Sequence, residues 1–185
     1  MPTGRPDAER ARRIALAAID VVAAAGVEGL THRAVAVKAE VPLGSTTYYF
    51  ATLEDLLEAA VAEAKGLAEA RLAGWLDRLA DYEDLAAGLA AYLVEQTGSQ
   101  REATIVEYEL YLAALRRPSL QRLSLEWDQS LTDVLAQLTD RLTATTLSAT
   151  VNGLALQSLV RGSSLSLEEA EPQQRRALEA DDKTG

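Results

Sequence analysis

Residues 30–57 read LTHRAVAVKAEVPLGSTTYYFATLEDLL and contain three helix starts in quick succession. Thr31 is the kind of residue that caps the first turn of a helix with its side-chain oxygen. Pro42 suits the first position of a second helix, because the N–H that proline lacks is not needed there. Thr52 and Asp55 have the spacing of a capping box, with Asp in place of the usual Glu, and begin a third helix. The segment therefore predicts two short helices joined by a tight turn and followed by a longer helix.

The short helix that follows Pro42 carries an unusual outward face. Leu43 lies four residues before Thr47, so both lie on one stripe of the helix. Gly44 and Tyr48 have the same spacing and lie beside them. Hydroxyl groups can donate to phosphates, glycine lets a backbone come close, and Leu and Tyr can touch thymine methyl groups. The stripe therefore suits the groove of a DNA duplex, although adjacent tyrosines taken alone could also be helix surface with one ring in the core.

Thr46 and Phe50 are four residues apart and lie on another stripe, and Phe50 is expected to be the apolar residue that faces the core, helped by Val41 in the turn. Upstream, Asp7 can cap a helix whose apolar residues recur every third or fourth position from Ile14. Gly26 is expected to end that helix in a left-handed conformation. Three helices with a tight turn before the last of them predict a helix-turn-helix lobe.

The rest of the chain has helical periodicity almost throughout, so we predict an all-α fold of about nine helices. The predicted organisation is an N-terminal three-helix domain over residues 1–51 and a C-terminal helical domain over residues 52–185. The later helices are expected at about residues 52–80, 84–98, 99–117, 119–142, 144–161 and 166–180, with the tail 181–185 frayed.

Over about residues 10–60 the chain resembles the N-terminal domain of the tetracycline-repressor (TetR) family. The consensus sequence of that family is close to T-x-R-x-I-A, followed by A-G-V-S-x-G-T-L-Y-x-Y-F and then x-S-K-E-x-L-L. The resemblance implies a DNA-binding transcriptional regulator, a ligand-responsive repressor that binds a near-palindromic operator as a homodimer. It also implies that the C-terminal domain binds a small-molecule effector of unknown identity and forms the dimer.

The family's DNA contacts can be placed on matching positions of this chain. Thr31 matches the helix-capping Thr, Ser45 matches a Thr that contacts phosphate, and Tyr48 matches a variable position that touches bases or phosphates. Phe50 matches a buried Phe. The implied DNA-binding residues are Thr31, Arg33, Leu43, Gly44, Ser45, Thr47, Tyr48 and Tyr49.

Four positions differ from the consensus sequence of the family. Glu40 replaces the usual turn Gly, so the turn must avoid a left-handed residue there or strain it. Pro42 replaces a capping Ser, and Thr47 is smaller than the usual Tyr. Leu53 replaces a Lys that commonly contacts the DNA backbone. The loss of this Lys should lower the salt dependence of DNA binding by about one phosphate contact.

Aromatic residues in the second half form a candidate effector site. The resemblance implies a small molecule between the middle helices, whereas the helical spacing of several of these residues also fits ordinary core packing. The candidate lining residues are Tyr92, Tyr108, Tyr111, Leu112 and Trp127.

Residues 144–162 read ATTLSATVNGLALQSLVRG and form an apolar helix with small residues interspersed. Such a helix is either a buried core helix or a subunit interface. In the TetR family the last two helices typically form a four-helix interface between two subunits, which favours the interface. The candidate interface residues are Leu147, Val151, Leu154, Leu156 and Leu159.

Composition argues against an enzyme. The chain has no cysteine and one histidine, so we expect neither a metal site nor a catalytic triad, and no cofactor motif is present. We expect no membrane span and no signal peptide, and hence a cytoplasmic protein.

The net charge of −10 is unevenly distributed. Residues 1–50 carry six basic and five acidic side chains, whereas the remaining 135 carry 12 basic and 23 acidic. The N-terminal lobe can therefore meet DNA, through an arginine cluster that is either a phosphate-binding arm or a solvated leader. The alternative function is a helical interaction module that has lost strong DNA binding. The arginines of the cluster are Arg5, Arg10, Arg12 and Arg13.

Overall fold

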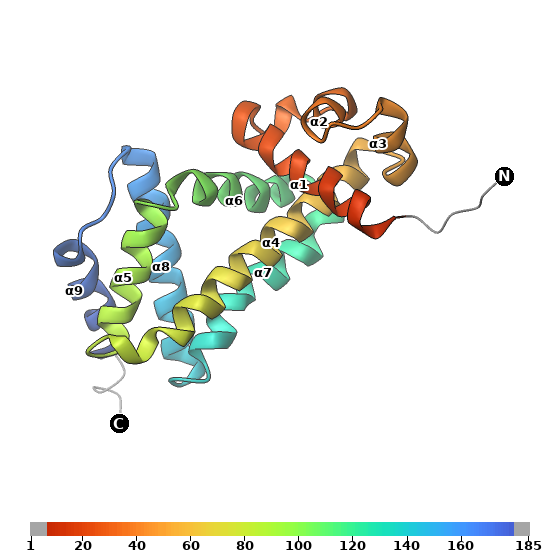
Figure 1. Ribbon diagram of the computed structural model, residues 1–185. Coiled ribbons are helices and arrows are strands. Elements are labelled where there is room, and N and C mark those ends of the chain that lie inside the picture. The colour runs from red at the N-terminus through yellow and green to blue at the C-terminus, as the bar shows by residue number, and fades with distance from the viewer. Residues whose placement is uncertain (1–6, 180–185) are drawn as a thin grey trace. The chain divides into compact units, whose positions relative to one another are not determined.

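The computed structural model describes residues 7–179, and this range is helical with no strand (Figure 1). The predicted all-α class is confirmed. Short 3-10 turns lie at residues 27–29, 79–81, 114–116 and 118–120. The helices are α1 (Ala8–Ala25), α2 (His32–Lys38), α3 (Leu43–Tyr49), α4 (Leu53–Asp77), α5 (Leu85–Thr97), α6 (Arg101–Ala113), α7 (Gln121–Leu135), α8 (Arg141–Arg161) and α9 (Leu167–Glu179).

The described chain forms two compact units. The first contains residues 7–68 and 106–125, and the second contains residues 69–105 and 126–179. Helices α4, α6 and α7 each begin in one unit and end in the other. A separate domain ending at residue 51 stays a prediction, because the compact unit continues into α4.

The first unit is built on the three N-terminal helices, in which α1 packs on α2 and α2 packs on α3. Asp7 caps α1 as predicted, since its carboxylate accepts from the N–H groups of Glu9 and Arg10. Ile14 of α1 and Leu56 of α4 are completely buried. The amphipathic pattern read from the sequence therefore becomes the core of this unit.

The second unit is held by α5, α8 and α9, with α9 packed on both of the others (Figure 1). One end of α9 is fixed by Arg175, which forms an ion pair of 2.6 Å with Asp84, the N-cap of α5. The other end is fixed where the N–H of Leu165 donates to the buried hydroxyl of Thr97 at 3.0 Å. The N–H of Ala87 and then the guanidinium of Arg175 hold the pKa of Asp84 below its ordinary value.

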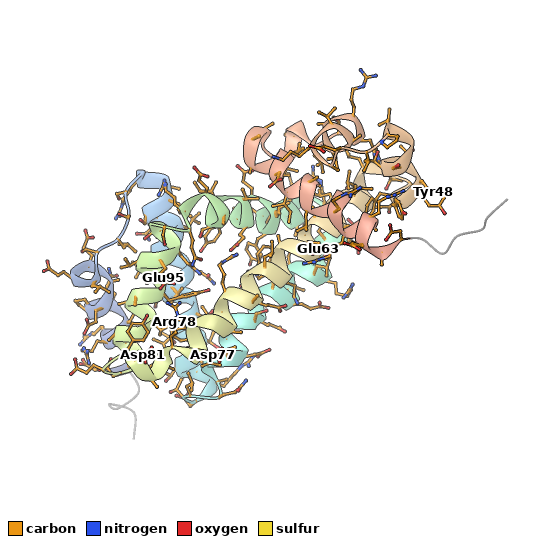
Figure 2. The ribbon with its side chains drawn as sticks, viewed as in Figure 1. Tyr48, Glu63, Asp77, Arg78, Asp81 and Glu95 are labelled. Atoms are coloured by element: carbon orange, nitrogen blue, oxygen red, sulfur yellow. The ribbon has the colours of Figure 1, made fainter. Side chains whose placement is uncertain are left out.

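Trp75 anchors the end of α4 within this second unit. Its side chain is fully buried, and its indole N–H donates to the carbonyl of Gly88 at 2.8 Å. Arg78, one turn further on, forms two hydrogen bonds with Glu95 of α5, at 2.9 and 3.1 Å (Figure 2). A tryptophan buried with its N–H satisfied contributes both apolar area and a directional bond.

Three details at helix ends differ from the sequence expectations. Gly26 ends α1 with φ 69° and ψ 173°, which is a positive φ as predicted but not the left-handed helical region. Pro42 is the N-cap of α3 instead of its first residue. The expected helix over 119–142 is interrupted, because Asp140 accepts from the N–H groups at the start of α8 and so begins a new helix.

None of the helices in the described range is both long and apolar enough to span a membrane.

Candidate nucleic-acid interface

Helices α2 and α3 form a helix-turn-helix. Thr31 caps α2 as predicted, with its hydroxyl oxygen accepting from the N–H of Ala34 at 3.1 Å. Backbone N–H groups of the turn donate hydrogen bonds to carbonyls at the end of α2. The N–H of Glu40 donates to Val37, and the N–H of Val41 donates to Ala36. This is the paired bonding of a Schellman motif, and it fixes the direction in which α3 leaves.

The outward face of α3 consists of Leu43, Gly44, Thr47 and Tyr48, and all four are exposed. The side chains of Leu43 and Tyr48 are 45% and 67% exposed. A Cβ built on Gly44 would meet no atom within 4 Å, so the backbone here is open to a close approach. Tyr48 projects outward from the ribbon (Figure 2). The four residues expected on one stripe therefore form one accessible surface.

The inward anchor of α3 is Thr46, not Phe50 as expected. Thr46 is completely buried, and its hydroxyl donates to the carbonyl of Leu43 at 2.8 Å. Phe50 and Val41 are only half-buried. Phe50 is the C-cap and has the extended conformation, with φ −132°, so its side chain leaves the stripe on which helical spacing had placed it.

Tyr49 lies between α3 and the start of α1. Its hydroxyl accepts from the backbone N–H of Asp7 at 3.3 Å. Its ring meets that of Tyr48 edge to face, with centroids 5.1 Å apart. These two contacts support a positioning role for Tyr49, which orients the exposed Tyr48 ring. Ser45 is half-buried beside them.

The basic side chains of this unit differ in their availability. Arg12 pairs with Glu63 at 3.0 Å, and Lys38 pairs with Asp20 at 3.4 Å. Arg10 lies 4.0 Å from its own helix cap, and Arg5 lies outside the described residues. Arg33 is exposed on α2 and, within residues 7–179, has no ion-pair partner, which leaves it available to a phosphate or a base.

Glu40 has φ 54°, and no other non-glycine residue in the described range has a positive φ. Glu40 therefore has the left-handed conformation, at the position of the Schellman motif that is normally glycine. The cost for a residue with a side chain is about 1–2 kcal/mol.

Glu40→Gly is expected to stabilise the protein by about 1 kcal/mol, because relief of backbone strain exceeds the extra chain entropy of glycine. Urea unfolding followed by circular dichroism measures this change. Glu40→Ala is the control, since alanine removes the carboxylate but keeps the Cβ. Equal stabilisation by both variants would assign the effect to charge instead of strain.

The candidate residues for an effector site are divided between the two units. Tyr92 is buried on α5, where its ring lies 5.5 Å from that of Trp75. Burial raises the pKa of Tyr92, and burial lowers the pKa of nearby Arg71. Trp127 of α7 belongs to the same unit as Tyr92. The candidates on α6 belong to the first unit and are not assigned to one site with them: Tyr108, Tyr111 and Leu112.

Trp75 was not among the sequence candidates, although it is the ring in contact with Tyr92. The sequence contained a signal for its burial, because Leu72 and Trp75 are three residues apart and so lie on one side of a helix. Both side chains are buried in the structure. That spacing predicts core residues, but it does not show which of them contacts Tyr92.

Helix α8 has two apolar faces. Leu147, Val151 and Leu159 are buried inside the protomer, so their side chains are unavailable to a second subunit. Leu154 is half-buried and Leu156 is 38% exposed. The opposite, solvent-facing stripe has spacings of four, three, four, three and four residues, and consists of Leu142, Thr146, Ala149, Gly153, Leu156 and Val160.

The sequence and the fold both match known regulators. Residues 80–180 match the family model described as "Tetracyclin repressor-like, C-terminal domain". The multidrug binding protein EbrR in complex with ethidium is 44% identical, with a TM-score of 0.81 over 91% of this chain and 98% of that one. Other EbrR structures contain proflavin and malachite green. No curated protein sequence matches the chain closely.

A second similar structure is SCO1917 of Streptomyces coelicolor A3, described as a member of the TetR family. It is 45% identical, with a TM-score of 0.80 over 91% of this chain and 98% of that one. The all-α fold and the helix-turn-helix of α2 and α3 are consistent with that class of DNA-binding regulator.

The chain belongs to the TetR family, and it is a ligand-responsive DNA-binding transcriptional regulator. Members of the family bind DNA operators and small-molecule ligands and act as dimers, and they are regulators, not enzymes.

Proposed function

We propose that the protein is a repressor that binds a near-palindromic operator as a homodimer and leaves it when an aromatic cation binds. The observation that carries the DNA half of the proposal is the exposed face of Leu43, Gly44, Thr47 and Tyr48 on α3. In a two-fold dimer the two copies of this face would enter successive major grooves, about 34 Å apart. Because its target is chromosomal DNA, the protein would act in the cytoplasm.

The exposed stripe of α8 supports the dimer. Its alternating spacing of three and four residues is that of a helix-pairing seam. Leu156 and Val160 supply apolar area at one end, with Val160 80% exposed. Ala149 and Gly153 lie one turn apart in the middle, and a Cβ on Gly153 would meet no atom within 4 Å. Small residues at that spacing allow two helices to approach closely.

Charge supports the direction in which the protein meets DNA. The acidic excess lies after residue 50, where the chain has 23 acidic and 12 basic side chains. Repulsion from phosphates would keep this part away from the duplex and leave the N-terminal helices to bind it. The same acidity would attract a cationic effector.

The effector class follows from the relatives and from the side chains available. Ethidium, proflavin and malachite green, which are bound in three of the EbrR structures, are aromatic cations. The faces of aromatic rings attract cations, and Trp127 of α7 is only half-buried. We therefore propose that this protein takes the same chemical class of ligand.

Regulation requires that the effector bind the two states of the protein with different affinity. Helices α4, α6 and α7 run through both compact units, and so provide continuous elements between the proposed effector region and the helix-turn-helix. A coupling of about 1–3 kcal/mol would change DNA affinity about 5- to 150-fold.

Malachite green is expected to bind the protein and to weaken operator binding by about 5- to 150-fold. Calorimetry on the protein alone measures the first effect, and fluorescence anisotropy of a labelled operator measures the second. Fluorescein, an anionic aromatic dye, is the control ligand, and the operator without protein controls for dye that binds DNA. Tight binding without release of DNA would rule out the effector role while leaving the DNA-binding role intact.

Tyr48→Ala is expected to weaken specific operator binding by about 1–3 kcal/mol, because an exposed ring on the outward face of α3 is lost. Binding to unrelated DNA should change little. A gel-shift titration against both duplexes measures the difference. The control is Leu167→Ala, which truncates an exposed residue on α9. Unchanged specific affinity in Tyr48→Ala would remove Tyr48 from the DNA contacts.

A further inference from the structure

Helix α3, the second helix of the helix-turn-helix, contains none of the side chains that can make two hydrogen bonds to one base. Its sequence is LGSTTYY. Guanine is read in the major groove by Arg or Lys, adenine by Asn or Gln, and cytosine by Asp or Glu. None of these residues occurs on α3, so the helix has to discriminate among base pairs by other chemistry.

The hydroxyl groups of α3 are partly engaged inside the helix. Thr47 donates to the carbonyl of Gly44 at 3.3 Å, and Thr46 is buried with its hydroxyl on Leu43. Ser45 is half-buried. Single hydroxyl groups also serve as donor or acceptor and so distinguish bases weakly. Hydrogen bonding from α3 therefore supplies little sequence selection.

Apolar groups dominate what remains exposed. Leu43 and Tyr48 of α3 are 45% and 67% exposed, and Val37 of α2 is 75% exposed. Among the base edges of the major groove, the 5-methyl group of thymine is the apolar one. Covering that methyl group with a leucine or a tyrosine ring removes apolar area from both partners, which is favourable.

Charge argues that the occupant of this face is DNA and not an apolar protein surface. Arg33 is exposed on α2, four residues before Val37, so the two lie on the same side of that helix. A guanidinium beside an apolar patch suits a groove in which phosphates border the thymine methyl groups. The open backbone at Gly44 permits the close approach that such contacts need.

We propose that the operator half-site is selected through thymine 5-methyl groups, which are contacted by Leu43 and Tyr48 of α3 with Val37 of α2 at the edge. This inference rests on the proposed function, because it specifies which DNA the exposed face prefers. Arg33 then contributes position and affinity, and the methyl contacts contribute sequence preference.

The test begins with an operator selected from a random duplex library by the full-length protein. Each thymine of the half-site is then replaced by uracil, which removes the methyl group and keeps the base pair and its oxygen. Loss of one buried methyl group should weaken binding about fourfold, or about fifteenfold when the symmetric thymines of both half-sites are replaced. Fluorescence anisotropy measures the affinities.

Two variants assign the contact to a residue. Leu43→Ala should lose the preference for thymine over uracil at one position of the half-site and keep it at the others. Tyr48→Phe should keep the preference at its own position, because the ring remains. Thermal unfolding of both variants checks that the fold is intact, which is expected since both side chains are exposed.

Equal affinity for the thymine and uracil operators would overturn the inference while leaving sequence-specific DNA binding in place. So would a selected operator without thymine in its half-sites, or a preference for thymine that survives unchanged in Leu43→Ala. Failure to select any DNA would overturn the proposed function itself, and that outcome is distinguishable from the others.

Discussion

Leu156→Lys is expected to convert the proposed dimer into monomers. Leu156 lies on the exposed stripe of α8, and in a two-fold interface each substitution appears twice, once from each subunit. An unpaired charge buried in such a seam costs about 3–5 kcal/mol. The dissociation constant of the dimer should therefore rise by at least a hundredfold. Sedimentation velocity at micromolar concentration measures the change from dimer to monomer.

Leu125→Lys is the matched control, because it makes the same substitution at another exposed leucine, on α7. We expect this variant to remain dimeric. The monomeric Leu156→Lys protein should also lose affinity for a two-half-site operator, since each subunit then binds one half-site alone. A Leu156→Lys protein that sediments as a dimer would place the subunit interface on another surface.

Trp75→Ala is expected to destabilise the protein by about 3–5 kcal/mol, the usual cost of removing a large buried aromatic side chain. Trp75 is fully buried, packs against Tyr92 and donates to the carbonyl of Gly88. Its loss therefore creates a cavity and removes the hydrogen bond from the indole N–H to the Gly88 carbonyl. Urea unfolding followed by far-ultraviolet circular dichroism measures the free energy of unfolding.

Trp127→Ala is the control for this substitution, because Trp127 is the only other tryptophan of the chain and is half-buried. It should lose distinctly less stability than Trp75→Ala. Trp75→Phe should have an intermediate effect, since the phenyl ring keeps much of the packing but lacks the N–H. Similar losses for the two alanine variants would show that Trp75 is not the anchor of the second unit.

Local chemistry explains why the helix starts of the N-terminal lobe could be predicted. Asp7 and Thr31 cap helices as expected, and the capping box of Thr52 and Asp55 is formed in both directions. Each of these contacts joins residues within three positions of one another, so the sequence contains all of the interaction. The cap at Asp140 was missed although it is equally local, because the apolar pattern continues on both sides of it.

Contacts between distant residues could not be predicted in the same way. The sequence assigned the core side of α3 to Phe50, whereas Thr46 takes it, because the extended conformation of Phe50 depends on how the chain leaves α3. On α8 both faces are apolar and have helical spacing. Periodicity therefore could not tell that Leu147 faces its own protomer and that Val160 faces outward.

The spacing of the two half-sites shows whether a dimer presents two α3 faces to one side of a duplex. A selected operator is compared with versions that carry five or ten extra base pairs between the half-sites. We expect affinity to fall most with five extra base pairs, which turn the second half-site to the opposite side of the duplex, and to recover in part with ten. Equal affinity for all three operators would contradict this arrangement.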